Sequence, residues 1–198
     1  MNAVGPIRIA VADDEPDMCQ YLQETLTSLG HQVVVTAQTG TQLIDGCRDQ
    51  HPDLIITDIK MPEVDGIEAS NIIARDRIIP VILVSAYHDP DLISRASHDH
   101  VLAYLVKPIK RADLETSIAI TIQRFLEFQE LRNEANGLRQ ALEDRKLIER
   151  AKGILMRRAE LDEASAFRRM QQLAREKNRK LVEIAEVILT AEEALQPK

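Results

Sequence analysis

Aromatic residues and cysteines are scarce in this chain, and each shortage excludes something. Aromatic residues make up 3% of the 198 positions and tryptophan is absent, which argues against a surface that binds bases by stacking them on many aromatic rings. Two cysteines, Cys19 and Cys47, cannot form a disulfide framework. The apolar run at residues 7–12 is far shorter than a signal peptide or a membrane span. We therefore expect a cytoplasmic protein with no membrane segment.

Proline is almost absent from the second part of the chain, because seven of the 8 prolines lie in residues 1–108. Charge is divided in a similar way. Residues 1–122 contain 9 basic residues (Lys and Arg) and 18 acidic residues (Asp and Glu), a net charge of −9. Residues 123–198 contain 16 basic and 14 acidic residues, a net charge of +2. With 44% apolar and 29% charged residues, the chain is globular in composition. The asymmetry indicates two domains of different construction.

Five short β-rich segments alternate with helix-period segments in the first part of the chain. Most of the strands are too apolar to have a solvent-exposed face, which is typical of a parallel sheet buried on both sides. We expect them at residues 7–11, 33–35, 54–57, 81–84 and 103–106. The pattern predicts an α/β doubly wound, five-stranded parallel sheet with helices on both faces. In the strand order 2-1-3-4-5, Cys19 and Cys47 lie on opposite faces and form no disulfide.

Charged and hydroxyl side chains follow the predicted strands at their carboxyl ends, where ligands bind in such sheets. These side chains are Asp13, Asp14, Glu15, Asp58, Ser85 and Lys107. Carboxylates crowded at one edge repel each other unless a cation lies among them, and a set of oxygen ligands suits Mg²⁺. Capping of the following helix is an alternative for Asp13. It explains neither Ser85 nor Lys107, so the pattern as a whole predicts a magnesium site.

These residues, with the stretch from Asp58 to Gly66, resemble the receiver domain of bacterial two-component response regulators. The resemblance covers residues 6–121 and implies a flavodoxin-like fold. It implies that Asp58 accepts a phosphoryl group from a sensor histidine kinase or a small-molecule donor. A carboxylate is a usable nucleophile when a divalent ion and a lysine offset the charge that gathers on the transferred group. All the chemistry found is thus self-phosphorylation, so we expect no independent enzyme.

The resemblance also implies roles for the residues around Asp58. It implies four Mg²⁺ contacts, from Asp13 through a bound water, Asp14, Asp58 and the main-chain carbonyl of Lys60. Ser85 and Tyr104 would be the switch residues, Lys107 would pair with the phosphoryl group, and the Lys107–Pro108 bond would be cis. Lys60 and Tyr87, which flank the site, are hypothesised to set the lifetime of the phosphorylated state. One departure is His100-Val101, where the family usually has Gly-Ala, so we expect an altered turn.

The second part of the chain is helical throughout, because residues 109–196 contain no proline. We expect the last receiver helix to continue past residue 121. Apolar residues recur at the three- and four-residue spacing of a coiled-coil seam: Ile118, Ile122, Phe125, Leu131, Ala135, Leu138 and Leu142. It predicts a coiled-coil linker over residues 122–140 and a parallel homodimer. The alternative is a helix laid along its own domain.

Basic residues cluster after the linker, where residues 145–180 carry a net charge of +7. On a helical wheel of residues 145–158, one side is apolar and the opposite side bears Lys146, Arg150, Gly153 and Arg157. A close approach by another backbone would explain Gly153. A second helix over 163–177, with Asp162 as N-cap, is expected to bury Phe167, Met170 and Ala174 and to expose Arg168 and Arg175. A third follows over 181–195. This surface suits a polyphosphate partner, although a solvated face with intrahelical ion pairs is the alternative.

Residues 150–156, Ala166-Phe167 and residues 181–185 resemble the ANTAR domain, an all-α three-helix RNA-binding module of transcription antiterminators. We place this domain at residues 141–196. The resemblance implies binding to paired RNA hairpins in nascent transcripts. Ala151, Lys152 and Gly153 match the family signature, and the helical wheel adds further candidate RNA contacts: Lys146, Arg150, Arg157, Arg168 and Arg175. The sequence of the turn at residues 175–180 differs from the small and apolar residues that some members of the family have there.

We therefore expect a response regulator of a two-component phosphorelay. Phosphorylation of Asp58 would promote dimerisation and RNA binding, and RNA binding would cause transcription antitermination. One alternative is a DNA-binding response regulator, with the last two helices as a helix-turn-helix. Against it, residues 181–195 contain four glutamates and no Lys or Arg, which is unfavourable near phosphates. Another alternative is a phosphorylation-switched protein-interaction module.

Overall fold

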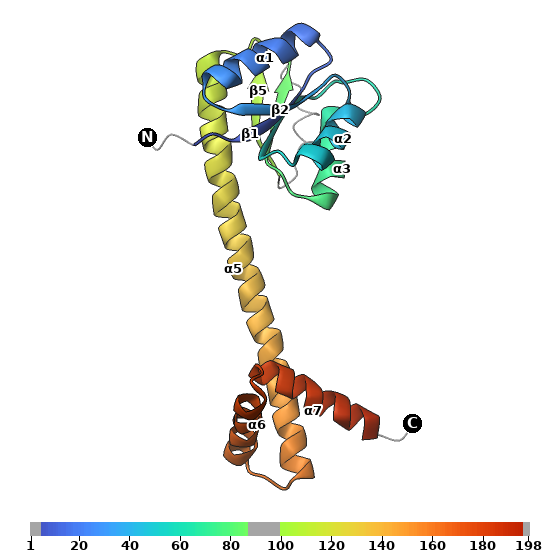
Figure 1. The fold of residues 1–198 in the computed structure, drawn as a ribbon, viewed down its shortest axis with the longest axis vertical. Helices are drawn as coiled ribbons and strands as arrows, with labels where there is room; N and C mark the ends of the chain where they lie inside the picture. The colour runs from blue at the N-terminus through green and yellow to red at the C-terminus, as the bar shows by residue number, and fades with distance from the viewer. Residues whose placement is uncertain (1–4, 87–99, 196–198) are drawn as a thin grey trace. The chain divides into compact units, whose positions relative to one another are not determined.

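The chain divides into two compact units, Met1–Gln129 and Glu130–Lys198. The computed structural model describes residues 5–86 and 100–195 (Figure 1). The helix α5 runs from Arg111 to Arg158 and contributes residues to both units. This confirms that the last helix of the first unit continues past residue 121. No helix in the described part of the chain combines the length and the apolarity needed to cross a membrane.

The first unit contains a five-stranded parallel sheet with the order β2-β1-β3-β4-β5. Its strands are β1 (Arg8–Ala12), β2 (Gln32–Ala37), β3 (Leu54–Asp58), β4 (Val81–Ser85) and β5 (Val101–Val106). Strands β3 and β4 are buried along their whole length, which explains why they read as continuous aliphatic runs. The doubly wound sheet predicted from the sequence is confirmed.

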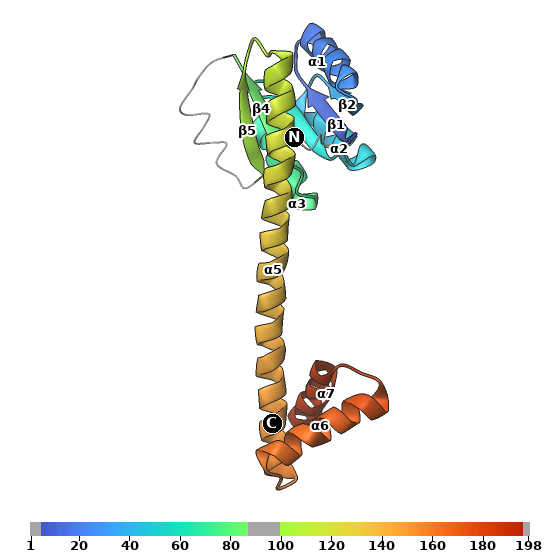
Figure 2. The same cartoon turned by 90° about the vertical axis from the view of Figure 1, so that its left-hand side faces the viewer.

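Helices cover both faces of the sheet (Figure 2). Helix α1 (Pro16–Ser28) and the first turns of α5 pack on one face, and α2 (Gly40–Gln50) and α3 (Gly66–Asp76) pack on the other. Because successive side chains of a strand point to opposite faces, β1 contributes to both layers. Cys19 lies in the α1 layer and Cys47 in the α2 layer, and both are free. The predicted separation of the two cysteines is therefore confirmed.

The second unit contains the end of α5 together with α6 (Glu163–Lys177) and α7 (Leu181–Leu195). Its core is aliphatic and consists of Ala151, Ile154, Met170, Ile184, Ala185 and Leu189. The Asp162 carboxylate accepts a hydrogen bond of 2.6 Å from the Ser165 backbone N–H, which satisfies one free donor of the first turn. The predicted helix ranges and the Asp162 N-cap are thus confirmed.

Two expectations about this unit are wrong. Phe167 was expected in the core, but 37% of it is exposed, and Ala166 is buried instead. The buried residues of α6 are therefore Ala166 and Met170, and Phe167 is not among them. An added Cβ on Gly153 meets only Arg157 Nη1, at 3.8 Å. Within the described residues, then, the close approach of another backbone that we expected at Gly153 does not occur.

The apolar residues predicted to form the coiled coil divide into two groups. Ile118 and Ile122 pack in the core of the first unit, and Phe125 is buried as well. For this part of α5 the alternative, a helix laid along its own domain, is correct. By contrast, exposure reaches 66% at Leu131, 63% at Leu138 and 60% at Leu142. Only this second group is available for pairing with another helix.

Candidate functional site

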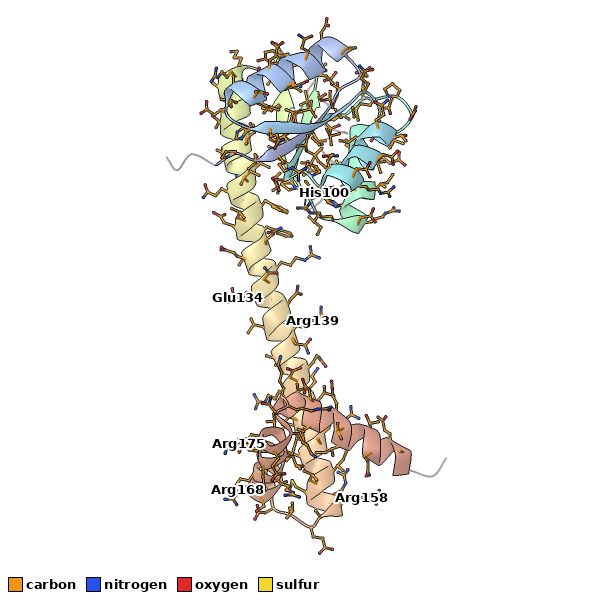
Figure 3. All side chains as sticks on the ribbon, in the orientation of Figure 1. His100, Glu134, Arg139, Arg158, Arg168 and Arg175 are labelled. Carbon is orange, nitrogen blue, oxygen red and sulfur yellow. The ribbon has the colours of Figure 1, made fainter. Side chains whose placement is uncertain are left out.

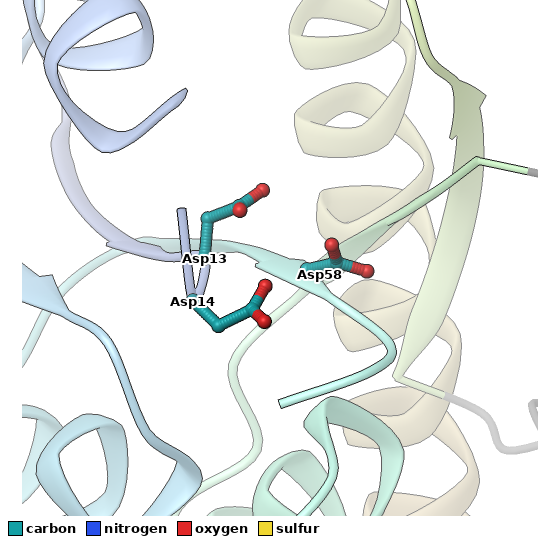
Figure 4. A group of neighbouring side chains, drawn as sticks. All are labelled: Asp13, Asp14 and Asp58. Carbon is teal, nitrogen blue, oxygen red and sulfur yellow. The ribbon is translucent and has the colours of Figure 1, made fainter. Parts of the chain in front are cut away.

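Three carboxylates meet at the carboxyl edge of the sheet (Figure 4). Asp13 and Asp14 follow β1, and Asp58 ends β3. These two strands are neighbours, with Ala12 opposite Thr57, so the sheet register itself brings the carboxylates together. One oxygen from each lies within 4.8 Å of the others. Asp13 and Asp58 are buried, whereas Asp14 is exposed.

Lys107 follows β5 and places its ammonium among these carboxylates. Its Nζ lies 2.8 Å from Asp58 Oδ2, 2.9 Å from Asp13 Oδ2 and 3.5 Å from Glu15 Oε1. Burial disfavours the ammonium, but the hydrogen bonds to Asp58 and Asp13 outweigh it and raise the pKa of Lys107 above its ordinary value. Burial also raises the pKa of Asp13. One lysine does not neutralise the group, so this set of oxygen donors fits a divalent cation such as Mg²⁺.

The loop after β3 holds Asp58 in place through close backbone contacts. The Lys60 backbone N–H donates to Asp58 Oδ1 at 3.2 Å, and the Gly66 N–H donates to the Ile59 carbonyl at 2.9 Å. An added Cβ on Gly66 would collide with the Asp58 carbonyl oxygen and would lie 2.8 Å from Thr57 Oγ1. The loop therefore requires glycine at position 66 for space. Lys60 itself is exposed beside Asp58.

Ser85 and Tyr104 come from the two strands beyond β3. Ser85 ends β4 and is buried, and its carbonyl accepts a hydrogen bond of 2.8 Å from the Lys107 backbone N–H. Tyr104 is half-buried on β5 and packs against the layer of α2 and α3. The Lys107–Pro108 bond is cis, as expected. Tyr87, the other residue of the lifetime hypothesis, lies outside the described residues.

The expected altered turn before β5 includes His100. This residue is buried, and its carbonyl accepts a hydrogen bond of 2.8 Å from the Val81 backbone N–H (Figure 3 labels the side chain). His100 therefore joins the start of β5 to the start of β4. Strand β5 still pairs in parallel with β4, but the register shifts by one residue after the pair Val81–Val101, so His100-Val101 is accommodated with an irregularity at the start of β5.

The basic candidates of the second unit fall into an exposed set and a covered set. Five side chains are exposed: Lys146, Arg150, Arg157, Arg168 and Arg175. Arg168 and Arg175 project from α6 (Figure 3). Lys146 also forms an ion pair of 2.8 Å with Glu143.

Two of the three signature residues are covered. Ala151 is fully buried in the core of the second unit, so its role is in packing. Lys152 is 8% exposed, and its Nζ lies 2.6 Å from Glu149 Oε2 and 2.7 Å from Glu163 Oε1. Hydrogen bonds to these two carboxylates raise its pKa. Lys152 therefore differs from the exposed arginines, because it already has two anionic partners.

The contacts of Glu15 with Lys107 and of Glu163 with Lys152 were not predicted from the sequence. Glu15 directly follows the aspartate pair, so its position was a usable signal. The pairing of Glu149 with Lys152 follows from their i,i+3 spacing on one helix. The pairing of Lys152 with Glu163 joins two helices, and no spacing along one helix indicates it.

A parallel sheet with three carboxylates and a lysine at its carboxyl edge defines a receiver-type signalling domain. The family model of the response regulator receiver domain matches residues 9–119, and that of the ANTAR domain matches residues 136–189. The chain therefore belongs to the response regulators and combines a receiver domain with a C-terminal ANTAR domain. It is a regulatory protein and not an enzyme. Receiver domains bind Mg²⁺ at such an acidic pocket and interact with histidine kinases, and ANTAR domains bind RNA.

Known proteins resemble the chain over different lengths. It is 37% identical to the transcriptional regulatory protein PdtaR of Mycobacterium tuberculosis over 188 residues. This alignment covers 95% of this chain and 92% of that protein. A crystal structure of a receiver domain protein from Clostridium thermocellum has a TM-score of 0.56 at 28% identity and covers 61% of this chain and 98% of that one. The crystal structure of the CheX–CheY–BeF₃–Mg²⁺ complex from Borrelia burgdorferi has a TM-score of 0.54 at 27% identity. The match covers 58% of this chain and 87% of that one.

Proposed function

We propose that this protein is a phosphorylation-controlled regulator that binds RNA and acts in transcription antitermination. A sensor histidine kinase phosphorylates Asp58, the phosphorylated chain dimerises, and two ANTAR domains bind hairpin RNA in a nascent transcript. The observation that supports this proposal most directly is the contact of 2.8 Å between Lys107 Nζ and Asp58 Oδ2, within a group of carboxylates. The name of the relative PdtaR, a transcriptional regulatory protein, supports the role in transcription.

The proposed phosphorylation is an attack by one carboxylate oxygen of Asp58 on the phosphorus of a phosphohistidine. The P–N bond breaks, the histidine leaves, and Asp58 becomes an aspartyl phosphate. Lys107 offsets the negative charge of the transferred group. Asp13, Asp14, Asp58 and the Lys60 carbonyl would hold Mg²⁺, which supplies further positive charge when it is bound. The crowding of carboxylates around one ammonium supports this assignment.

The switch that we propose uses the two strands next to the site. A phosphoryl group adds negative charge and acceptor oxygens at Asp58, and the Ser85 hydroxyl donates a hydrogen bond to it. Tyr104, which is half-buried on β5, then moves inward behind Ser85. The change alters the surface of β5 and the start of α5. The pairing of Asp58 with Val84 of β4 supports this route because it places Ser85 next to the site.

Dimerisation is proposed to use the exposed leucines of α5. Leu131, Leu138 and Leu142 follow the spacing of a coiled-coil seam, and each is at least 60% exposed. Burial of these side chains against a second copy removes apolar surface from water. A dimer offers two RNA-binding modules, and the second binds at high effective concentration, which raises avidity by about 10² to 10⁴-fold.

The alternative, a DNA-binding response regulator, would use α7 as the recognition helix. That helix contains Glu183, Glu186, Glu192 and Glu193 and has no Lys or Arg, so it repels phosphates. The Glu192 carboxylate also forms an ion pair with Arg158, with 3.0 Å between Glu192 Oε2 and Arg158 Nε. The exposed basic residues proposed as RNA contacts lie instead on α5 and α6. This distribution favours binding through α5 and α6, as proposed for RNA.

The proposal is tested by measuring RNA affinity and molecular mass with and without phosphorylation. The probe is a pool of hairpin RNAs with randomised loops, and the protein is phosphorylated with acetyl phosphate and Mg²⁺. We expect the monomer to become a dimer and RNA affinity to rise by about 10²-fold or more. Duplex DNA of the same stem sequence is the control and should bind more weakly. Equal RNA affinity in both states, or a monomer in both, contradicts the proposed coupling.

Single arginine variants test which surface binds the phosphates. Arg150→Ala and Arg168→Ala each remove one exposed cation from the basic surface. Each should weaken binding to all hairpins alike and should lower the slope of log affinity against log salt concentration by about 1. Arg139→Ala is the matched control, because Arg139 is exposed on α5 before the basic cluster. If Arg139→Ala reduces the slope as much as Arg168→Ala, the phosphate surface is not the one proposed.

A further inference from the structure

The hydroxyl of Tyr21 links helix α1 to the loop between β5 and α5, where the start of α5 lies beside α1 (Figure 1). Tyr21 Oη donates a hydrogen bond of 2.9 Å to the Ile109 carbonyl, 88 residues further along the chain. Within the described residues, Tyr21 is not a member of the apolar layer around Leu22, and 38% of it is exposed. The hydrogen bond, rather than burial of the ring, is therefore the distinctive contact of this side chain.

Lys107 lies two residues before Ile109, and its main chain is also held on the other side. The Lys107 backbone N–H donates to the Ser85 carbonyl at 2.8 Å. Ile109 is 7% exposed, and the carbonyl of a buried residue requires a hydrogen-bond partner. Pro108, between Lys107 and Ile109, has a fixed φ, so little conformational freedom remains in this short segment. Ser85 thus holds the segment before Lys107, and Tyr21 holds the segment after it.

The exact position of Lys107 matters because its ammonium contacts two carboxylates at once. Its Nζ lies 2.8 Å from Asp58 Oδ2 and 2.9 Å from Asp13 Oδ2. A displacement of the Lys107 backbone lengthens at least one of these contacts. Phosphoryl transfer depends on positioning and on stabilisation of the charge of the transferred group. A residue that holds the Lys107 main chain therefore affects the reaction without touching the phosphoryl group.

We propose that Tyr21 is a positioning residue for the phosphorylation of Asp58. Its hydroxyl fixes the Ile109 carbonyl and thereby holds the Lys107 ammonium where the phosphoryl group arrives. This inference rests on the proposed phosphorylation of Asp58 and adds a residue of α1 to it. Because Tyr21 acts through the main chain around Lys107, its effect is the same for every phosphodonor.

The test compares the wild type with Tyr21→Phe, which removes the hydroxyl and keeps the ring. Each full-length protein is phosphorylated with acetyl phosphate or with phosphoramidate in the presence of Mg²⁺, and phosphate-affinity gel electrophoresis follows the rate. Loss of this hydrogen bond should slow phosphorylation by about 3- to 10-fold, and by the same factor with both donors. No histidine kinase is present, so a contact between Tyr21 and a kinase does not contribute to the measured rates.

Ser28→Ala is the matched control, because it removes another hydroxyl of α1. Ser28 Oγ donates to the Thr25 carbonyl at 2.7 Å, within the same helix, and has no link to the loop after β5. This variant should therefore be phosphorylated at the wild-type rate. Thermal unfolding monitored by circular dichroism verifies that each variant is folded.

A second measurement observes Lys107 directly. In protein labelled with ¹⁵N-lysine, an ammonium held by hydrogen bonds exchanges its protons slowly enough to give an NMR signal, and Lys107→Met identifies the signal of Lys107. Tyr21→Phe should shift or broaden this signal. Lys152, which pairs with Glu149 and Glu163 in the second unit, is the internal reference and should be unchanged. A role of Tyr21 in stability alone would not move the Lys107 signal.

A slower Tyr21→Phe protein with an altered Lys107 signal supports the proposal. The positioning role is wrong, while phosphorylation of Asp58 stands, if Tyr21→Phe reacts at the wild-type rate or is slowed with one donor only. The same holds if Ser28→Ala slows the reaction equally or if the Lys107 signal is unchanged in Tyr21→Phe. If the wild type incorporates no phosphate from either donor, the proposed function fails and the positioning role fails with it.

Discussion

The Asp58→Asn variant is expected to incorporate no phosphate from acetyl phosphate, whereas the wild type becomes phosphorylated. An amide nitrogen is not a nucleophile at this position, and the remaining oxygen lacks the negative charge that attacks phosphorus. The buried neighbour Asp13 does not replace it. Asp13 Oδ2 is held 2.9 Å from Lys107 Nζ and has no solvent exposure, so a phosphodonor does not reach it. Phosphate-affinity gel electrophoresis measures the phosphorylated fraction.

Asp45→Asn provides the matched control for this experiment. Asp45 lies on α2 with its side chain 71% exposed, and its contact with Arg48, at 4.0 Å, is weak. The same chemical change there should leave phosphorylation at the wild-type level. Phosphorylation of Asp58→Asn at a rate near that of the wild type would show that another carboxylate is the acceptor. Peptide mapping by mass spectrometry would then locate it.

The Gly66→Ala variant is expected to lower the free energy of unfolding of the receiver domain by about 3 kcal/mol or more, because the new methyl group overpacks a closed loop. The clash is with the Asp58 carbonyl oxygen, and backbone moves less readily than a side chain. Any relief displaces Asp58 from Lys107, so phosphorylation should slow as well. All three tyrosines lie in residues 1–104, so tyrosine fluorescence during urea denaturation reports on this domain.

Gly137→Ala adds the same methyl group, but it is expected to raise the free energy of unfolding rather than lower it. Gly137 lies within α5, and an added Cβ there meets no described atom within 4 Å. Alanine should therefore stabilise the helix by about 1 kcal/mol, seen as a higher midpoint by circular dichroism at helical wavelengths. A Gly66→Ala protein with the wild-type midpoint and phosphorylation rate would mean that the loop after β3 relaxes without cost.

The receiver fold and its acidic pocket were predictable because their signals are local. Apolar runs identify β1, β3, β4 and β5, and residues at or just after the end of such strands share the carboxyl edge of a parallel sheet. Chain order alone thus brought Asp13, Asp58 and Lys107 together. The register that places Ala12 opposite Thr57 was not needed for that inference.

The second unit was less predictable because a helical wheel does not settle which apolar residue faces the core. Ala166 and Phe167 are adjacent, and the larger side chain was expected to be buried. In the structure the smaller residue, Ala166, has no exposure, whereas 37% of Phe167 is exposed. The start of α5 shows a related ambiguity, since Ile118 fits a coiled-coil seam and a domain core equally well. Only the three-dimensional contacts distinguish the two.

The continuity of α5 makes one secondary-structure element part of two hydrophobic cores. One end of the helix supplies Ile118 to the receiver core and the other supplies Ala151 to the ANTAR core. A break of the helix at an exposed position between them would cost intrahelical hydrogen bonds, but it would remove no side chain from either core.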